Sequence, residues 1–264
     1  MTEDTLQPAD YRIILLGASN LTLSLPRLIT SLRAGLPGKV EIQAAAGHGR
    51  SYLGWSHVIH RGLPGLQDCS LWETIKQRPP AKQTYAMFTD LGCDLFYGAM
   101  PQQIVDAVQV CMTRFQEMSA KTIYVRPPLG PLNKISNWRY YLVKNVFFPG
   151  PTIPWATMQR YIHEVEAGAS QIATELDFET VIPKDDWYGF DPIHIKRSFR
   201  DIAWSEILSP WDLDPTPPVS SPSLREALNI WTRKAAEGTL WRVIKRQRSQ
   251  PVIKWEDGST LSLF

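Results

Sequence analysis

The stretch YRIILLGASNLTLSLP, residues 11–26, decides how this chain folds. Its first half is a short apolar run that stops at Gly17, which is typical of a buried strand. Its second half begins a leucine pattern at helical spacing, for which Asn20 or Thr22 is a suitable N-cap. The small residues between the two halves predict a sharp turn. That turn places Ser19 at the carboxyl end of a strand, where backbone N–H groups of α/β proteins face a ligand crevice.

The same alternation of short apolar runs and longer amphipathic stretches recurs along the chain. Because parallel strands need long crossover connections, this order predicts an α/β protein with a mostly parallel sheet between helix layers. The predicted strands are residues 12–16, 40–46, 83–88, 122–125 and 179–182. The predicted helices are residues 21–32, 55–59, 71–75, 101–115, 156–176 and 195–208.

The segment after residue 210 differs in composition from the rest, because it is rich in proline. Residues 1–210 are predicted to form the main domain, residues 211–222 a linker and residues 223–264 a small C-terminal appendage. In the appendage we expect a helix over residues 224–237 and strands over residues 240–244, 252–255 and 260–264. An Asp-Gly pair at Asp257 predicts a hairpin turn between the last two strands.

Composition narrows the class of protein. With 44% hydrophobic and 20% charged residues among 264, the chain is typical of a globular protein with a full core. The net charge of +2 gives no reason to expect a polyanionic partner. No run approaches the roughly 20 apolar residues of a membrane helix, and the first ten residues lack the features of a signal peptide. Cys69, Cys93 and Cys111 are odd in number and lack metal-ligand spacing, which favours a reducing compartment.

From these observations we expect a cytoplasmic protein with no membrane span, no nucleic-acid partner and no metal. Whether the chain forms a homo-oligomer stays open.

Four predicted strands end in polar or glycine-rich groups, and these ends share one edge of a parallel sheet. They carry Ser19, the Gly47–Gly49 turn, the Gly92–Asp94 block, and Asp191 with His194 three residues later. Acyl transfer needs a hydroxyl nucleophile, a histidine that moves its proton, and a carboxylate that orients the histidine. Ser19, His194 and Asp191 supply these three groups.

The order and content of these motifs resemble the SGNH (GDSL) hydrolase family over roughly residues 10–210. The resemblance implies a flavodoxin-like three-layer α/β/α sandwich. It also implies hydrolysis of a small-molecule carboxylic ester or thioester through an acyl-enzyme, without a metal or organic cofactor. In that family pattern Ser19 is the nucleophile, His194 the general base and Asp191 its orienting carboxylate. The backbone N–H groups of Ser19 and Gly47 then donate to the oxyanion.

Two positions depart from the family pattern. Ala18 stands where the family's Gly-Asp-Ser block has aspartate. If Asp94 aligns with the aspartate of the third block, Cys93 replaces the oxyanion asparagine, and a thiol is a poor hydrogen-bond donor. Losing one oxyanion donor costs about 10²–10³ in turnover. Two interpretations follow: a serine hydrolase or acyltransferase, in which Asn20 could replace the missing donor, or a weakened relative that serves as a binding or scaffold protein.

Several further residues are assigned ordinary roles. His48 is expected to be a loop residue, and Asp90 is expected to bond nearby loop amides. The basic residues Arg242, Lys245, Arg246 and Arg248 are expected on a solvated strand face rather than at a nucleic-acid site. The aromatic residues from Trp138 to Phe148 predict either core packing or a lid over an acyl pocket.

Overall fold

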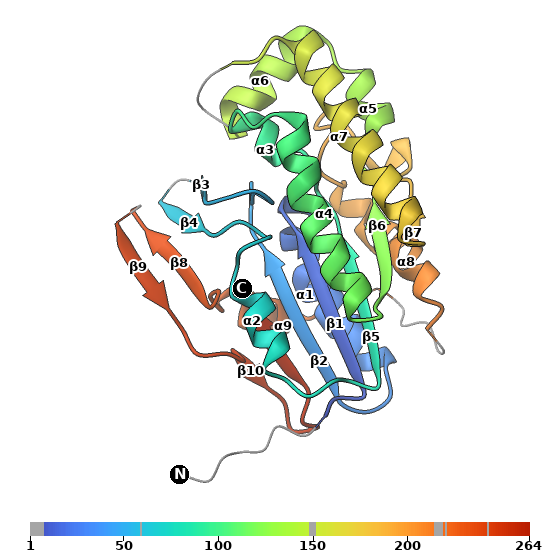
Figure 1. Ribbon diagram of the computed structural model, residues 1–264, viewed down its shortest axis with the longest axis vertical. Coiled ribbons are helices and arrows are strands. Elements are labelled where there is room, and N and C mark those ends of the chain that lie inside the picture. Colours follow the sequence, from blue (N-terminus) through green and yellow to red (C-terminus); the bar gives the residue numbers. More distant parts are fainter. Residues whose placement is uncertain (1–7, 59, 148–151, 214–218, 220, 242) are drawn as a thin grey trace.

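The computed structural model describes residues 8–58, 60–147, 152–213, 219, 221–241 and 243–264 (Figure 1). Over these residues the main sheet has seven strands in the order β10-β11-β2-β1-β5-β6-β7. Its strands are β1 (Tyr11–Gly17), β2 (Val40–Ala46), β5 (Gln83–Phe88), β6 (Lys121–Val125), β7 (Glu179–Val181), β10 (Ile253–Lys254) and β11 (Thr260–Leu263). A second, four-stranded sheet consists of β3 (Ser56–Val58), β4 (Arg61–Leu63), β8 (Glu237–Leu240) and β9 (Ile244–Gln247).

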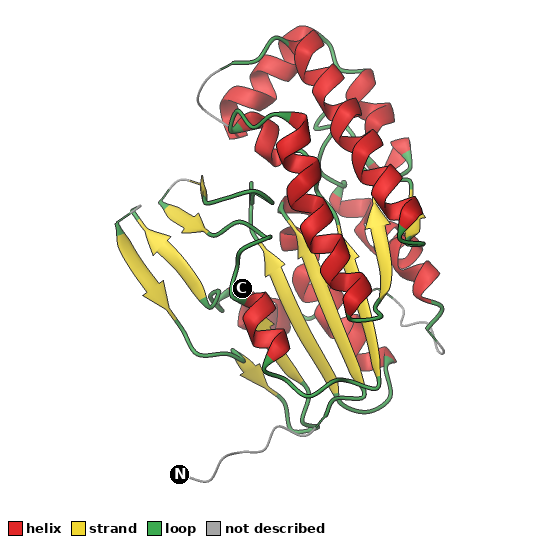
Figure 2. Cartoon of the chain, in the orientation of Figure 1, coloured by secondary structure: helices red, strands yellow, loops and turns green. Residues whose placement is uncertain are grey.

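Five neighbouring strands of the main sheet run parallel to one another, in the order β2-β1-β5-β6-β7. When these five strands are numbered by their position in the chain, the order is 2-1-3-4-5, which is the flavodoxin-like arrangement. The predicted fold class, a mostly parallel sheet in a three-layer α/β/α sandwich, is therefore confirmed. Figure 2 shows the helices on both faces of this sheet.

The helices in the described residues are α1 (Ser19–Gly35), α2 (Leu71–Lys76), α3 (Cys93–Phe96), α4 (Pro101–Glu117), α5 (Leu129–Asn133), α6 (Asn137–Phe147), α7 (Trp155–Glu175), α8 (Arg200–Leu208) and α9 (Leu224–Trp231). None of them is long and apolar enough to cross a membrane.

Two apolar cores lie on opposite faces of the sheet because successive side chains of a strand point to opposite sides. Ile13 and Leu15 of β1 pack with α1, α8 and α9 on one face. Ile14 and Leu16 pack with α2, α4 and α7 on the other face. All four side chains are fully buried. The apolar run that identified the first strand is thus buried on both sides, as expected for a central parallel strand.

Four predicted elements are wrong in type or extent. The helix expected over residues 224–237 ends at Trp231, and Glu237 begins β8. The helix expected over residues 55–59 is the short strand β3, which pairs antiparallel with β4, and residue 59 lies outside the described residues. The strand expected over residues 240–244 contains the turn between β8 and β9, where Trp241 has φ 54°. The helix expected from residue 195 starts at Arg200, after a 3-10 turn. In each case pairing or packing with distant residues overrides a weak local pattern.

The C-terminal residues contribute to the main sheet. β11 pairs in parallel with β2, while β8 pairs with β4 in the second sheet. The predicted hairpin turn is present between β10 and β11, and Gly258 takes the left-handed conformation there at φ 80°. Half of the predicted linker, residues 214–218 and 220, lies outside the described residues.

Leu261 tests how strongly β11 supports the main core, because its side chain is fully buried. We expect Leu261→Ala to lower the free energy of unfolding by about 2–5 kcal/mol, since the truncation leaves a cavity in a packed interior. Leu224→Ala is the matched control, because Leu224 is 72% exposed, and we expect a change of no more than about 0.5 kcal/mol. Urea unfolding measures both, and equal effects would contradict the placement of β11 in the core.

Candidate active site

The crevice that holds Ser19 arises from the way the chain leaves two adjacent strands. The helix after β1 covers one face of the sheet, whereas the helices after β5 cover the other. Between the carboxyl ends of two such strands an open α/β sheet has its ligand crevice. Ser19 is the first residue of α1, directly beside this crevice.

The turn before Ser19 requires glycine for steric reasons. A Cβ atom on Gly17 would lie 2.8 Å from Cγ2 of Thr89, which follows β5. The predicted N-cap at Asn20 or Thr22 is wrong: the N-cap position is Ala18, and no side chain of the helix itself caps it. Instead Asp90, from the loop after β5, accepts hydrogen bonds from the N–H groups of Ala18 at 2.9 Å and Leu21 at 3.2 Å. This confirms that Asp90 bonds loop amides, and it ties the start of α1 to the neighbouring strand end.

Ser19, His194 and Asp191 lie in hydrogen-bond contact. Oγ of Ser19 is 2.8 Å from Nε2 of His194, and Nδ1 of His194 is 2.6 Å from Oδ2 of Asp191. The side chains of His194 and Asp191 are 17% and 36% exposed, so solvent reaches both of them in part. Residues that are 175 positions apart in the sequence are therefore brought together as the motif order predicts.

Asp191 is held as a carboxylate by several donors. Its Oδ1 accepts hydrogen bonds from the N–H groups of Ile193 at 3.0 Å and His194 at 3.3 Å. Burial alone would raise the pKa of Asp191, but the hydrogen bond and charge of His194, together with these two N–H groups, lower it below its usual value. An ionised Asp191 orients the His194 ring so that Nε2 faces Ser19.

Asn20 braces the loop that carries Asp191 and His194. Its Nδ2 donates to Oδ1 of Asp90 and to the carbonyl of Ile193, both at 2.8 Å. Its Oδ1 accepts the N–H of Ile195 at 2.9 Å. A side-chain amide has only two hydrogens to donate. The expectation that Asn20 replaces a missing oxyanion donor is therefore wrong for its side chain, which is fully used in this brace.

A cavity of about 560 Å³ opens beside Ser19 and His194. Most of its wall is apolar, with residues such as Leu91, Phe96, Leu132, Tyr188, Trp204 and Ile207. Gly47 does not line it. The loop after β2 instead reaches the cavity through His48 and Gly49, and Gly49 has φ 59°. The sequence pointed to this turn but not to the second glycine, because nothing in the local pattern shows which N–H faces the crevice.

Cys93 and Asp94 have different surroundings although they are neighbours. Cys93 lines the cavity, and burial, followed by the charges of Asp90 and Asp94, raises the pKa of its thiol well above the usual value. The protonated thiol is unsuited to act as a nucleophile. Asp94 is 2% exposed and does not line the cavity. Its carboxylate accepts the hydroxyl of Ser51 and the N–H of Tyr52, so it anchors the loop after β2.

His48 is an exposed loop residue, as expected, but it also borders the cavity. Partial burial of its ring, and then the nearby charge of His194, lower the pKa of His48. Among the described residues, no three His, Cys, Asp or Glu side chains form a group that could hold a metal ion.

Comparisons with known proteins find only distant similarities, and these are to solved structures. No protein-family model matches the chain, and no curated protein matches it. Among solved structures, the chain is similar to several that are described as esterases. A psychrotrophic esterase, EstA from Pseudoalteromonas sp., shares 12% identity over 76% of this chain and 98% of that chain, with a TM-score of 0.45. An aryl esterase from M. smegmatis shares 15% identity over 77% and 99% of the two chains, with a TM-score of 0.47.

A third solved structure, AlinE4, is described as an SGNH-hydrolase family esterase. It shares 15% identity over 81% of this chain and all of its own, with a TM-score of 0.40. With TM-scores below 0.5, these similarities carry no argument about this chain. The function of this chain rests on the geometry around Ser19.

Asp191 makes stability depend on pH. Because its folded-state pKa is lowered, its carboxylate stabilises the fold above the unfolded-state pKa, and this contribution is lost as the pH falls through the folded-state value. We therefore expect the difference in free energy of unfolding between wild type and Asp191→Asn to be largest above about pH 5 and to shrink toward about pH 3. Urea titrations across this range measure it, with Asp186→Asn as an exposed control. A difference that grows on acidification would contradict this assignment.

Proposed function

We propose that this protein is a serine hydrolase or acyltransferase that acts on a carboxylic ester or thioester through an acyl-enzyme. The observation that carries the proposal is the pair of contacts at His194, 2.8 Å to Oγ of Ser19 and 2.6 Å to Oδ2 of Asp191. A hydroxyl, an imidazole and a carboxylate in this order form the arrangement that activates serine for acyl transfer.

In the proposed reaction, Oγ of Ser19 attacks the carbonyl carbon of the substrate while Nε2 of His194 takes the hydroxyl proton. Asp191 stabilises the imidazolium that forms. The tetrahedral intermediate collapses, His194 returns the proton to the leaving alcohol or thiol, and an acyl-Ser19 ester remains. Water or an alcohol then attacks this ester with His194 again acting as base, which gives hydrolysis or acyl transfer.

The oxyanion is proposed to bind backbone N–H groups at two strand ends. The first N–H groups of a helix have no partner inside the helix. Asp90 takes those of Ala18 and Leu21, which leaves the N–H groups of Ser19 and Asn20, and that of Ser19 is assigned to the oxyanion. The second donor is assigned to Gly49 rather than Gly47, because Gly49 lines the cavity and Gly47 does not.

The cavity supports an apolar acyl group as the part of the substrate bound beside Ser19. Its volume of about 560 Å³ falls in the range of small-molecule sites, and its wall is largely hydrophobic. Polar residues are the minority of the lining, and they include Ser19, His194 and Asp90 together with Arg126 and Arg200. This pattern is typical of a site in which shape and burial hold the substrate while few polar groups fix the reacting atoms.

Ser19→Ala tests the nucleophile. We expect the variant to lose covalent labelling by a fluorophosphonate probe and to hydrolyse activated esters at least about 10³-fold more slowly, because the attacking oxygen is gone. Ser136→Ala, which changes an exposed serine, should label like the wild type. Equal labelling of wild type and Ser19→Ala would remove the proposed mechanism.

A binding or scaffold role on the same fold is the second candidate, and Cys93 favours it. Cys93 lines the cavity, and if Asp94 aligns with the aspartate of the family's third block, Cys93 stands where that family has its side-chain amide donor. If the protein is a weakened enzyme, Cys93→Asn should raise turnover of activated esters by up to about 10²–10³, because one oxyanion donor is restored. Cys93→Ala adds no donor and should give no increase. The absence of ester turnover in both wild type and Cys93→Asn would favour the binding role.

A further inference from the structure

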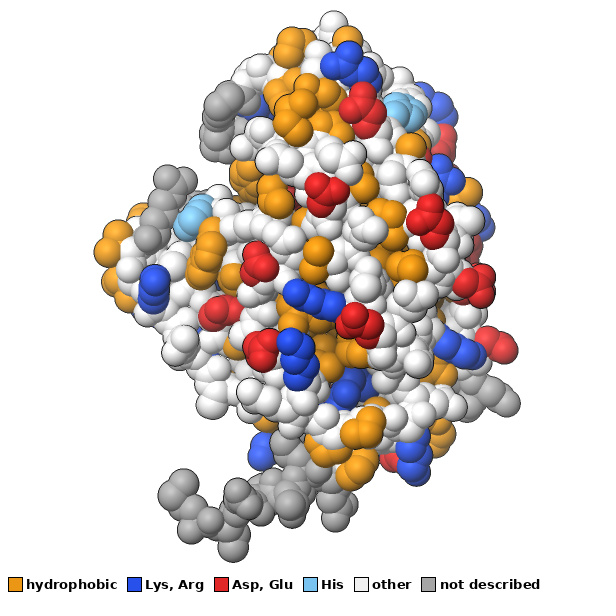
Figure 3. Space-filling view, viewed as in Figure 1, with side chains coloured by type: hydrophobic (Ala, Val, Ile, Leu, Met, Phe, Trp, Pro, Cys, Tyr) orange, Lys and Arg blue, Asp and Glu red, His pale blue; other side chains and the backbone are white. Residues whose placement is uncertain are grey.

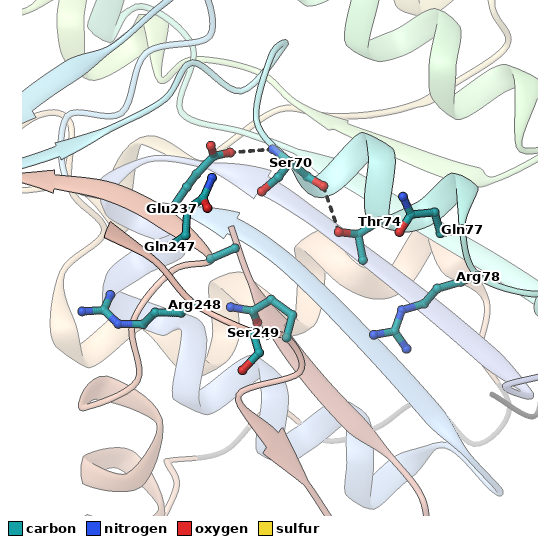
Figure 4. Close-up of a pocket in the computed structure, with 10 residues that line it drawn as sticks. Ser70, Thr74, Gln77, Arg78, Glu237, Gln247, Arg248 and Ser249 are labelled. Atoms are coloured by element: carbon teal, nitrogen blue, oxygen red, sulfur yellow. Dashed lines mark hydrogen bonds between the residues drawn. The ribbon is translucent and has the colours of Figure 1, made fainter. Parts of the chain in front are cut away.

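A second cavity, of about 660 Å³, lies between α2 and the segment that leads from β9 to β10 (Figure 4). It shares no lining residue with the cavity beside Ser19. All of its lining residues except Ala236 are polar. This composition is the reverse of the apolar wall near Ser19, so a different chemical class of ligand is expected here.

Buried charges beside this cavity are not balanced. Nε of Arg12 donates to Oε2 of Glu41 at 2.7 Å, and Nη1 of Arg78 lies 2.8 Å from Oε1 of the same carboxylate. The three side chains are only 6%, 9% and 5% exposed for Arg12, Arg78 and Glu41. Two guanidinium groups thus share one carboxylate, and no other carboxylate of the described residues pairs with either. A buried excess positive charge is unfavourable unless an anion compensates it.

Three side-chain donors of residues that line the cavity are buried and have no partner among the described residues. They are Nε of Arg78, Oγ of Ser70 and Nε2 of Gln250. Native proteins leave few buried polar atoms unpaired, and a group of such atoms around one cavity indicates a ligand that accepts hydrogen bonds. In Figure 4 Arg78 extends from the end of α2 toward the segment that carries Ser249.

We propose that this cavity binds a small phosphorylated polyol or sugar. In the proposed complex the side chains of Arg78, Ser70 and Gln250, whose free donors are buried in this structure, turn toward the cavity and donate to the oxyanion. The oxyanion then compensates the excess charge of the Arg12–Glu41–Arg78 group. The hydroxyl groups of the ligand meet Glu237 and Gln247, which lie opposite each other on paired strands. Glu237 accepts the N–H of Ser70 at 2.6 Å, and a carboxylate has further lone pairs for hydroxyl donors.

The size and charge of the region favour a small ligand over a nucleic acid. The volume falls in the range of small-molecule sites. On the face shown in Figure 3, acidic and basic side chains are interspersed and no continuous positive track crosses it. Arg248 lines the cavity, and Lys245, two residues before Gln247, lies on the same face of β9 as Gln247, so these two cations favour an anionic ligand. A nucleic acid needs a longer row of such cations.

Isothermal titration calorimetry with inorganic phosphate and ribose 5-phosphate as probes tests the proposal. We expect saturable binding of one molecule per chain, with ribose 5-phosphate binding more tightly because its hydroxyl groups meet Glu237 and Gln247. Gln247→Glu should weaken binding by at least about tenfold, because a negative charge then faces the phosphate. Gln116→Glu makes the same charge change at an exposed position of α4 outside the cavity and should leave affinity unchanged.

Arg78→Lys gives an independent reading, because lysine keeps the charge but loses the Nε donor, and we expect weakening of at least about tenfold. Arg78 also pairs with Glu41, so the free energy of unfolding of Arg78→Lys is measured alongside its affinity. Gln247 is exposed, and Gln247→Glu leaves the Arg78–Glu41 pair intact. The proposal is overturned if neither probe binds saturably, or if Gln247→Glu binds like Gln116→Glu. It is also overturned if an oligonucleotide binds and ribose 5-phosphate does not compete.

Discussion

The candidate site depends on the hydrogen bonds between the carboxylate of Asp90, which follows β5, and the first backbone N–H groups of α1. Asp90 takes the left-handed conformation at φ 62°, which aspartate adopts more readily than most residues. In this conformation it accepts two backbone N–H groups of the α1 turn and one hydrogen of Asn20. An anion near a helix N-terminus is also favoured by the helix dipole. The position of Ser19 is thereby set by the neighbouring strand end.

A second aspartate, Asp94 in the short helix α3 that follows this loop, fixes the other side of the crevice. Asp94 holds the loop after β2 through Ser51 and Tyr52, whereas Asp90 holds α1. Asn20 then connects Asp90 to the backbone around His194. The loop after β5 therefore joins the other loops of the site into one hydrogen-bonded unit. Such cross-links keep catalytic groups within narrow tolerances, which acyl transfer requires.

The C-terminal residues contribute both to the polar cavity, which Ser70 and Gln247 line, and to the main sheet. β11 extends the main sheet beside β2, and β8 and β9 extend the second sheet beside β4. The segment between β9 and β10 then faces α2 and encloses the polar cavity. Residues from both halves of the chain thus form a wall around Arg78. The buried excess charge there is a cost in stability that a bound anion would offset.

Local patterns in the sequence predict much of this architecture. Apolar runs marked the central strands, and the Asp-x-x-His spacing located the partners of Ser19, because these signals depend only on residues close in the sequence. The chain alone did not reveal that Asn20 is used as a brace, nor that Gly49 rather than Gly47 lines the crevice. Both depend on which atoms meet across the folded sheet.

The sequence by itself thus determined the alternation of strands and helices, the turn that presents Ser19, and the motif that carries Asp191 and His194. Only the tertiary structure decided that β11 joins the main sheet and that the residues around Trp55 form an edge strand. The physical reason is that periodicity records which side of an element is buried, whereas strand partners are chosen by contacts between residues far apart in the chain.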